Sequence, residues 1–295
     1  MSTKTSLDAL NGMPEAAFIA SMGDIFEHAP WVAEAAFRAR PFATVTALHE
    51  AMMAAVRVAS SNQQLSFLRG HPELGGKVAR AGAMTADSVA EQGGLGLNRL
   101  SDAEFDRFEA LNARYRESFG FPFIICVRRQ TRDAILAEFA RRVVLPHDTE
   151  LAAAIAEIGH ITRLRLVAKV EGPGMPKTEG RLSTHVLDTH SGKPAAGVHI
   201  RLFEVGESAR SLIAETVTNH DGRTDQPLIG GGPLRAGVYE IEFGLGDYFR
   251  GKGVTLARPA FLDVVPIRFG IAEPEGHYHV PLVATPWTYS TYRGS

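Results

Sequence analysis

A change in hydrophobic period near the middle of the chain constrains its fold more than any other sequence feature. Before residue 170, apolar residues recur every three or four positions, which is typical of amphipathic helices. After residue 180 they alternate with polar residues, which is typical of strands. The segment between them, VEGPGMPKTEG, is dense in Gly and Pro and predicts a linker. We therefore expect a multidomain α plus β protein, with an all-α domain over 1–169, a linker over 170–180 and a β-domain over 181–295.

Local signals place helices in the first half. Ser101 precedes an amphipathic run as an N-cap, Glu104 occupies the capping-box position and Gly120 is a stop signal. Thr131 caps a second run, TRDAILAEFARRVV, in the same way. Pro30 suits the first turn of a helix, where its missing N–H has no intrahelical partner.

The second half reads as short strands separated by turns. In GVYEIEFGL, Tyr239, Ile241 and Phe243 fall on one face of a strand, and Glu240 and Glu242 on the other. HSGKPAAG, NHDGR and IGGGPLRAG supply turns. Short alternating strands at this spacing predict a β-sandwich.

Composition excludes several classes of partner. The formal net charge of −2 provides no basic excess for nucleic-acid phosphates or an anionic membrane. No apolar run is long enough to span a bilayer, and the N-terminus lacks the apolar core of a signal peptide. The single cysteine, Cys126, lies in the apolar run FPFIICV and is expected to be a buried, inert thiol. A cytoplasmic protein is the simplest interpretation.

Histidines in the β-half are candidates for chemistry. His277 and His279 flank Tyr278 in HYHVPL, and His185 lies in a predicted strand. If Tyr278 and its alternating neighbours face the core, we expect His279 to point outward, to solvent or to a subunit interface. Surface histidines with ordinary hydrogen bonds are one interpretation. A zinc site is another, although no cysteine or carboxylate accompanies the imidazoles.

Four motifs in this half resemble those of the transthyretin-related 5-hydroxyisourate hydrolases: LSTHVLDTHSGKPA, TNHDGR, HYHVPL and the terminal YSTYRGS. The Tyr-Arg-Gly-Ser ending is typical of the hydrolases rather than of hormone-carrying transthyretin. The resemblance implies a transthyretin-like β-sandwich that forms a homotetramer with active sites between dimers. It also implies catalytic roles for His185, Arg223, His279 and Ser295, and substrate contacts from Tyr292 and Arg293. Which histidine is the general base stays open.

A Gly-rich stretch, RGHPELGGKVARAGAMTADSVAEQGGLGL, is the least ordinary part of the helical half. Pro72 disfavours an α-conformation at His71, so this imidazole is expected on an extended or turn backbone. Thr85 can cap a short helix on which Ser88 lies one turn before Glu91 and Gln92. A loop that merely joins helices is the alternative. The glycine spacing matches neither a phosphate loop nor a dinucleotide fingerprint.

Residues 6 to 167 are similar to the decarboxylases of OHCU, 2-oxo-4-hydroxy-4-carboxy-5-ureidoimidazoline. HPELGGK, TADSVAEQGGLGL, FGFPFIICVR and ITRLRL carry this resemblance. It implies an all-α, dimeric, cofactor-free enzyme in which His71 donates a proton and Glu91 is its partner. The implied substrate contacts are Pro72, Ser88, Gln92, Phe123, Ile124, Ile125 and Arg165. Arg163 is the alternative to Arg165.

Together the two resemblances imply a bifunctional enzyme of urate degradation, because the hydrolase would produce the substrate of the decarboxylase. Neither half is expected to need a metal or an organic cofactor. We expect small-molecule substrates and a homo-oligomer that dimerises through the α domain and forms tetramers through the β domain. The alternative is a transthyretin-like binding or oligomerisation module attached to a single active decarboxylase.

Overall fold

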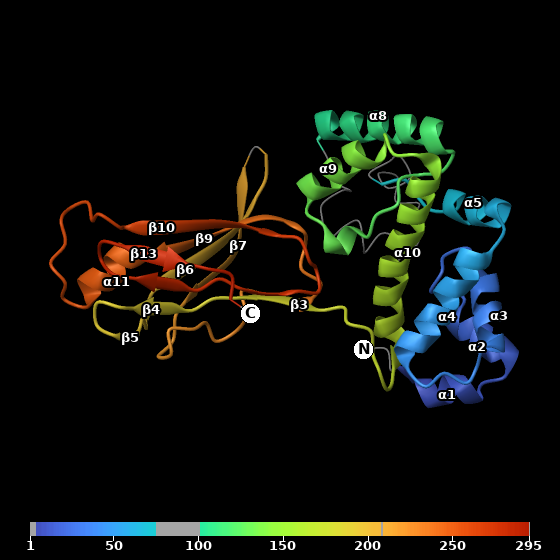
Figure 1. The fold of residues 1–295 in the computed structure, drawn as a ribbon, viewed down its shortest axis with the longest axis horizontal. Coiled ribbons are helices and arrows are strands. Elements are labelled where there is room, and N and C mark those ends of the chain that lie inside the picture. Colours follow the sequence, from blue (N-terminus) through green and yellow to red (C-terminus); the bar gives the residue numbers. More distant parts are fainter. Residues whose placement is uncertain (1–3, 75–100, 208, 295) are drawn as a thin grey trace. The chain divides into compact units, whose positions relative to one another are not determined.

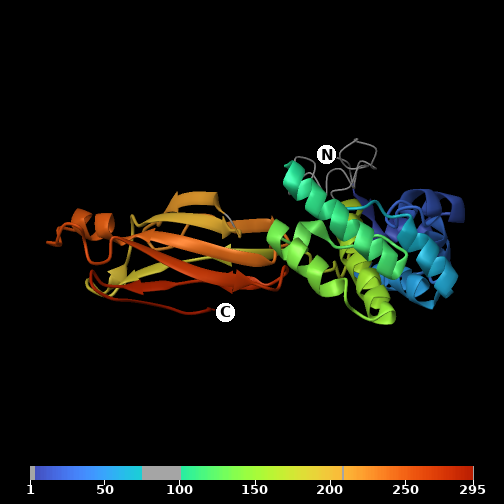
Figure 2. The same ribbon diagram turned by 90° about the horizontal axis from the view of Figure 1, so that it is seen from above.

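The structure is a computed structural model that describes residues 4–74, 101–207 and 209–294. The chain divides into two compact units. One comprises Met1–Val127 and Ile135–Thr178, and the other comprises Arg128–Ala134 and Glu179–Ser295. The first unit consists mainly of helices and the second mainly of strands (Figures 1 and 2). The predicted multidomain α plus β fold is thus confirmed.

The described helices of the first half occur in the following chain order. They are α1 (Leu7–Gly12), α2 (Glu15–Met22), α3 (Pro30–Arg38), α4 (Val45–Val58), α5 (Ser61–Arg69), α8 (Asp102–Phe119), the 3₁₀ turn η2 (Val127–Arg129), α9 (Arg132–Arg142) and α10 (His147–Lys169).

The predicted helix signals are present in the structure. Ser101 caps α8 in a reciprocal capping box with Glu104, and Gly120 ends that helix in the left-handed conformation at φ 72°. Pro30 occupies the first turn of α3. The Thr131 hydroxyl accepts a hydrogen bond from the first turn of α9 at 3.3 Å. Local sequence therefore fixes where these helices begin or end.

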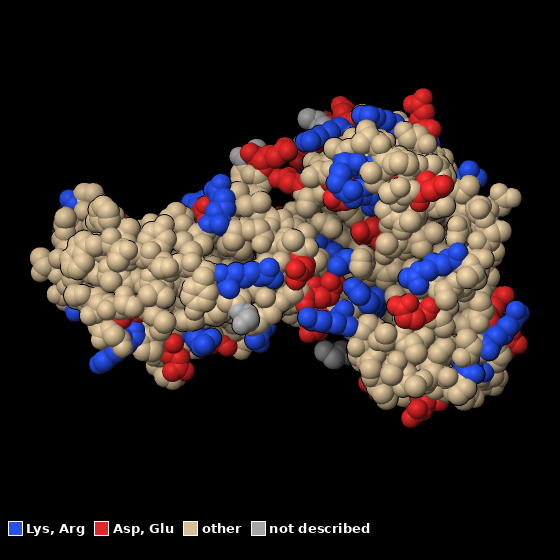
Figure 3. All heavy atoms as spheres, viewed as in Figure 1, with Lys and Arg blue, Asp and Glu red and all other residues tan. Residues whose placement is uncertain are grey.

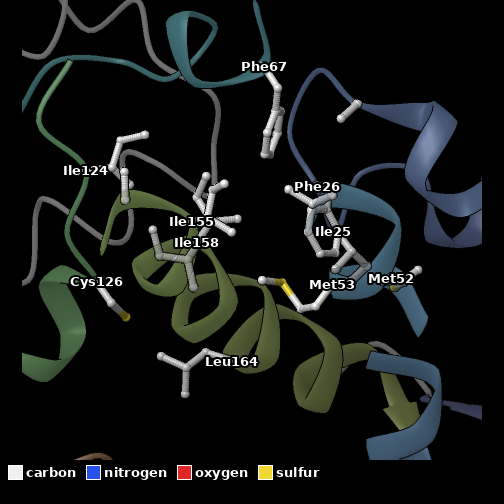
Figure 4. Packing of buried hydrophobic residues seen from close by; sticks show 14 of the residues in the cluster. Ile25, Phe26, Met52, Met53, Phe67, Ile124, Cys126, Ile155, Ile158 and Leu164 are labelled. Atoms are coloured by element: carbon white, nitrogen blue, oxygen red, sulfur yellow. The ribbon is translucent and has the colours of Figure 1, made fainter. Parts of the chain in front are cut away.

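Helix α10 forms the centre of the helical core. Its buried side chains include Ile155, Ile158 and Leu164, which project from different sides of the helix (Figure 4). Met53 of α4 and Phe67 of α5 belong to the same buried cluster. Because α10 contacts both α4 and α8, it is apolar around much of its circumference.

A fully buried ion pair joins α9 to α10. The side chains of Arg142 and Glu150 are 2% and 0% exposed, and Arg142 Nε donates to Glu150 Oε1 at 3.0 Å. The Tyr115 hydroxyl donates to the same carboxylate. Arg142 Nη1 donates to the carbonyl oxygen of Ile124 at 2.9 Å. The pair therefore uses its hydrogen-bonding capacity to anchor the chain segment between α8 and η2.

The first half of the predicted linker belongs to the helical unit. Strand β2 (Val170–Glu171) pairs in parallel with β1 (Thr5–Ser6). The carbonyl oxygens of Pro173 and Gly174 then accept hydrogen bonds from the first turn of α4, at 2.9 and 3.1 Å. Residues 170–174 are therefore held by the helical unit through their backbone.

The sandwich contains one large sheet and two smaller ones. The large sheet is antiparallel, in the order β10 (Val264–Ile271), β9 (Gly237–Gly244), β6 (His199–Val205), β7 (Arg210–Val217). The second layer consists of β11 (His277–His279), β3 (Gly180–Ser183) and β8 (Ile229–Gly232), and of β13 (Tyr289–Thr291), β12 (Leu282–Ala284), β4 (Val186–Asp188) and β5 (Lys193–Pro194). Helix α11 (Leu245–Gly251) follows β9.

Both layers contribute to one apolar core. Tyr239, Ile241 and Phe243 of β9 are buried in it, as the sequence alternation predicts. Glu240 and Glu242 lie on the other face, yet they are only 6% and 7% exposed. Three arginines cover and pair with these carboxylates: Arg201, Arg210 and Arg268.

The described surface carries charges of both signs. On the face shown in Figure 3, Lys and Arg lie among Asp and Glu. No helix among the described residues is long and apolar enough to cross a membrane.

Substitutions of two adjacent arginines can measure how much the buried Arg142–Glu150 pair contributes to the free energy of unfolding. We expect Arg142→Met to lower the free energy of unfolding by about 3–5 kcal/mol, because Glu150 is left buried without its cation. Arg141→Met is the matched control, since Arg141 is 57% exposed and pairs with Glu138 at the surface. Its expected cost is below about 1 kcal/mol. Chemical denaturation of both variants measures the difference, and equal costs would contradict this account of the pair.

Candidate active sites

A cleft in the helical unit gathers residues from four separate chain segments. It is lined by Glu27, His71, Pro72, Leu74, Phe123, Ile124, Ile125, Val127, Ile161 and Arg165. His71 follows the end of α5, and its backbone N–H donates to Leu68 in the last turn of that helix at 3.1 Å. Ile161 and Arg165 lie one turn apart on α10, so both face the same side of that helix. Most of the cleft wall is apolar.

The structure separates the two candidate arginines of α10. Arg165 lines the cleft that contains His71. Arg163 lines a different cleft between α4 and α10, where its Nη2 lies 3.2 Å from His160 Nδ1. Two residues along a helix correspond to a rotation of about 200°, which places the two side chains on different faces. Arg165 is therefore the arginine that lies beside His71.

Glu27 is a cleft residue that the sequence analysis missed. Its carboxylate lies 3.4 Å from Arg165 Nη2, and the two side chains are only 9% and 8% exposed. Glu27 stands in the mostly apolar motif IFEHAPW, directly before His28 with its positive φ of 60°. A carboxylate placed among apolar residues was the available signal, since such a group is buried only when paired.

Burial dominates the electrostatics of His71. It lowers the pKa of the imidazole to about 4, with Arg165 and His28 acting in the same direction and Glu27 opposing them. His71 Nε2 is buried and has no hydrogen-bond partner among the described residues. A neutral imidazole with an unsatisfied ring nitrogen thus faces a cleft that contains a guanidinium, as a ligand-binding histidine would.

The backbone of the cleft wall is held from behind. Arg142 donates to the Ile124 carbonyl oxygen, and Glu157 Oε2 accepts a hydrogen bond from the Cys126 N–H at 2.7 Å. Phe123 stacks on Phe139 of α9 with ring centroids 3.9 Å apart. Cys126 itself is buried, as predicted. The cleft therefore has a rigid wall of backbone whose polar groups are fixed by buried side chains.

Three predicted residues of this site, Ser88, Glu91 and Gln92, lie outside the described residues. His71, Pro72, Phe123, Ile124, Ile125 and Arg165, by contrast, all line one cleft. The roles of all nine residues remain predictions.

A second cleft, with a volume of about 400 Å³, lies in the sandwich. It is lined by Arg181, Ser183, Thr184, Arg223, Thr224, Asp225, Gln226, Pro227, His277 and His279. It lies where the second layer is interrupted between β3 and β4 and between β11 and β12. His185 occupies the first interruption, and His279 is the last residue of β11. At these interruptions the side chains do not have to alternate between the two faces as they do in a regular strand.

His279, which lines this cleft, contacts a second imidazole, that of His185, which is not itself among the lining residues. His185 Nδ1 lies 2.7 Å from His279 Nε2, and the rings are nearly parallel with centroids 4.9 Å apart. Ser183 Oγ lies 2.9 Å from His279 Nδ1 and 3.1 Å from His277 Nε2. His277 and His279 therefore point to the same side of β11, as residues two apart on an unbulged strand must.

The face predicted for His279 is confirmed, but the side chain is largely covered. Tyr278, Val280 and Leu282 face the core and His279 lines the cleft on the other side, yet it is only 9% exposed. The C-terminal segment covers it: the Gly294 N–H donates to the His279 carbonyl oxygen at 2.8 Å. Strand alternation predicts which side chains point away from the core. It cannot show that the end of the chain covers that face of the strand.

A tight turn brings Arg223 to the histidines. Asn219 Oδ1 accepts hydrogen bonds from the N–H groups of Asp221 and Arg223, and Gly222 adopts a φ of 70°. Arg223 then forms an isolated antiparallel bridge with His185. The NHDGR motif thus places a guanidinium beside the histidine pair.

Desolvation and positive charge keep this pair neutral. Burial lowers the pKa of His279 to about 4, with His185, Arg223, His277 and Arg181 acting in the same direction. Burial and Arg223 also lower the pKa of His185. At neutral pH both imidazoles are therefore available as proton acceptors.

The other C-terminal candidates lie apart from the histidines. Arg293 stacks on the Tyr278 ring, with its guanidinium 4.6 Å from the centroid, and lies 3.7 Å from Glu273. Tyr292 is 56% exposed. Neither residue lines the cleft in a single chain, and Ser295 lies outside the described residues. Across the described residues, no group of three or more His, Cys, Asp or Glu side chains has a geometry that could hold a metal ion.

Family models match both halves of the chain. Residues 11–167 match the OHCU decarboxylase model, and residues 182–294 match the HIUase/Transthyretin family model. The chain belongs to the OHCU decarboxylase family through its helical half, and its other half is a member of the HIUase/transthyretin family.

Individual relatives agree with this assignment. A 5-hydroxyisourate hydrolase from Pseudomonas aeruginosa is 55% identical over 122 residues, which are 41% of this chain and 97% of that protein. An OHCU decarboxylase from Haloferax volcanii is 42% identical over 164 residues, which are 56% of this chain and 95% of that protein. A crystal structure of (S)-allantoin synthase is 36% identical and covers 99% of this chain and all of its own, with a TM-score of 0.55. The similarity to that enzyme therefore spans both halves.

Gly294 offers a test of how the chain end positions His279. A Cβ atom at residue 294 would lie 2.7 Å from His279 Cδ2, so Gly294→Ala must displace the imidazole or the chain end that covers it. We expect this variant to lose most of any activity in the sandwich and to keep any activity of the helical half. Gly270→Ala is the matched control, because a Cβ there meets no atom within 4 Å. Equal activities in the two variants would show that His279 does not depend on this contact.

Proposed function

We propose that this chain is a bifunctional enzyme of urate degradation. The sandwich hydrolyses 5-hydroxyisourate to OHCU, and the helical domain decarboxylates OHCU to (S)-allantoin. The observation that carries the proposal is the match of both halves, in one chain, to the families of these two enzymes. The cleft in each half contains polar groups suited to the corresponding reaction.

For the hydrolase we propose that His185 and His279 act together as general base and acid. Water must attack a ring carbonyl carbon of 5-hydroxyisourate, and a neutral imidazole can accept its proton as the new C–O bond forms. The same pair then returns a proton to the leaving nitrogen as the C–N bond breaks. The lowered pKa values of both histidines support the first step, because they keep the base unprotonated at neutral pH.

Arg223 is proposed to orient the substrate and stabilise the oxyanion. A guanidinium presents two parallel N–H groups to a planar, urea-like ring. Its backbone bridge to His185 supports this proposal, because Arg223 then lies next to the proposed base. Ser295, Tyr292 and Arg293 are proposed to complete the site at the chain end.

For the decarboxylase we propose that His71 delivers the proton that replaces CO₂. The electrons left by CO₂ can move into the adjacent C=N bond of the imidazoline, so the substrate supplies its own electron sink and no organic cofactor is required. Protonation on one face then gives a single enantiomer. Arg165, held by Glu27, is proposed to bind a carbonyl or carboxylate of the substrate, with Pro72, Ser88, Gln92 and the Phe123–Ile125 backbone around it.

The low pKa of His71 fits this role once substrate is included. An anionic substrate adds negative charge to the cleft, which favours the protonated imidazole. Glu91, the proposed partner of His71, would act in the same direction. His71 would therefore become protonated only when the anionic substrate is bound, and its proton would be available once CO₂ has left.

Polar residues in the sandwich cleft argue against the carrier alternative. A carrier of apolar ligands needs an apolar pocket, whereas this cleft is lined by imidazoles, guanidiniums and a carboxylate. The family matches of both halves likewise support two enzymes rather than a decarboxylase with an inert oligomerisation module.

We further propose a cytoplasmic homo-oligomer, dimeric through the helical domain and tetrameric through the sandwich. Exposed apolar side chains on the edge strand β7 support self-association of the sandwich, since monomers rarely expose contiguous apolar patches. They are Leu212, Ile213 and Val217, each more than 40% exposed.

Two alanine variants test the division of labour. With fresh 5-hydroxyisourate, we expect His185→Ala to slow ring opening by about 100-fold or more, and His71→Ala to leave ring opening intact while OHCU accumulates. Absorbance and ¹³C NMR of the early reaction follow each species before spontaneous decay. His220→Ala, at an 88% exposed position, is the control and should leave both steps unchanged. If either active-site variant blocked both steps, the assignment of one reaction to each half would be wrong.

A further inference from the structure

A row of hydrogen bonds extends from the sandwich cleft beyond the two proposed catalytic histidines. His185 Nδ1 contacts His279 Nε2 at 2.7 Å, and His279 Nδ1 contacts Ser183 Oγ at 2.9 Å. Ser183 Oγ in turn lies 3.1 Å from His277 Nε2. Three consecutive contacts thus connect His185 to His277 through groups that can each give and accept a proton.

The sheet register fixes this row. Strands β3 and β11 run in parallel, with Ser183 opposite His279 and Arg181 opposite His277. Because His277 and His279 are two residues apart, both imidazoles stand on the face that carries the Ser183 hydroxyl. The backbones of Ser183, His277 and His279 are therefore held by the ladder, and that of His185 by its bridge to Arg223.

We propose that Ser183 and His277 form a proton relay behind the His185–His279 pair and position its protons for ring opening. The proposal rests on the hydrolase function proposed above. Ser183 and His277 line the same cleft, but in this proposal they act on the reaction through His279 and are therefore positioning residues.

Two proton arrangements satisfy the row when all four groups are neutral. In the first, His185 donates to His279, His279 to Ser183, and Ser183 to His277, which leaves His185 Nε2 unprotonated and able to accept a proton. In the second, every donor is reversed and His185 Nε2 carries a proton that it can donate. The relay therefore connects the base and acid forms of the same imidazole.

The relay accounts for each proton of the reaction. As the water oxygen bonds to the carbonyl carbon, His185 Nε2 accepts the water proton, each group passes its proton onward, and His277 becomes an imidazolium. When the C–N bond breaks, the protons shift back and His185 Nε2 protonates the leaving nitrogen. The row returns to its first arrangement, and no external reagent is consumed.

Positive charges around the cleft disfavour a cation on His279. Arg181 of β3, Arg223 of the turn and His277 of β11 all act in this direction. Asp225 is the carboxylate that lines the same cleft. Passing the proton along the row avoids holding a full positive charge on the most buried imidazole.

Replacing the hydroxyl tests the relay directly. We expect Ser183→Ala to lower kcat for ring opening about 10- to 100-fold with little change in KM, because base catalysis is impaired but substrate contacts remain. Ser183→Thr retains the hydroxyl and should recover most of the loss. The pH–rate profile should shift in Ser183→Ala, and a wild-type proton inventory in H₂O–D₂O mixtures should be curved and become linear in that variant.

A second variant distinguishes a relay from a local packing effect. His277→Asn should match Ser183→Ala, and the double variant should be no slower than either single one, since all three break the same row. The decarboxylase activity of each variant, measured with OHCU made by a separate hydrolase, reports whether the chain is folded. Folded single variants with kcat and pH profile within twofold of wild type, or losses that multiply in the double variant, would overturn the relay. If the wild-type chain itself failed to open 5-hydroxyisourate, the proposed hydrolase function would fail instead.

Discussion

The parallel pairing of β3 with β11 is the interaction on which the polar cleft of the sandwich depends. It brings together His185 and His279, which are 94 residues apart in the chain, and sets the distance between their ring nitrogens. The second layer stops and restarts beside both histidines, and Arg223 reaches them through a bridge to His185. A regular sheet would have kept these side chains apart, so the chemistry of this half depends on where its ladder is interrupted.

In the helical half, buried charged side chains hold the residues of the cleft in position. A cleft of loop backbone needs its polar groups fixed, and here Arg142 and Glu157 hold the strip that includes Ile124 and Cys126. Burying Arg142 is costly, but Glu150 and Tyr115 complete its hydrogen bonds. The strip then faces His71 across a mainly apolar cleft, where burial keeps the imidazole neutral. Both halves therefore hold neutral histidines close to an arginine.

Local chemistry predicted much of this architecture from sequence. Ser101, Glu104 and Gly120 bound α8 as expected, since caps depend on neighbours in the chain. The alternation in β9 correctly identified its core face. Alternation also identified the face of His279, but not its burial, because the segment around Gly294 covers that face. Glu27 was missed for a similar reason, because its partner Arg165 is 138 residues away. The sequence could not decide between Arg163 and Arg165 because helix period does not show which face meets a cleft.

Both reactions are proposed to occur in one chain and in sequence, and circular dichroism during turnover can follow the chiral product of the second. Purified wild-type protein is mixed with freshly made 5-hydroxyisourate, and the optical activity of the product is followed. We predict that a signal of (S)-allantoin appears as fast as the substrate is consumed, because protonation occurs within a chiral cleft. A racemic, optically silent product formed only at the spontaneous rate would contradict the account.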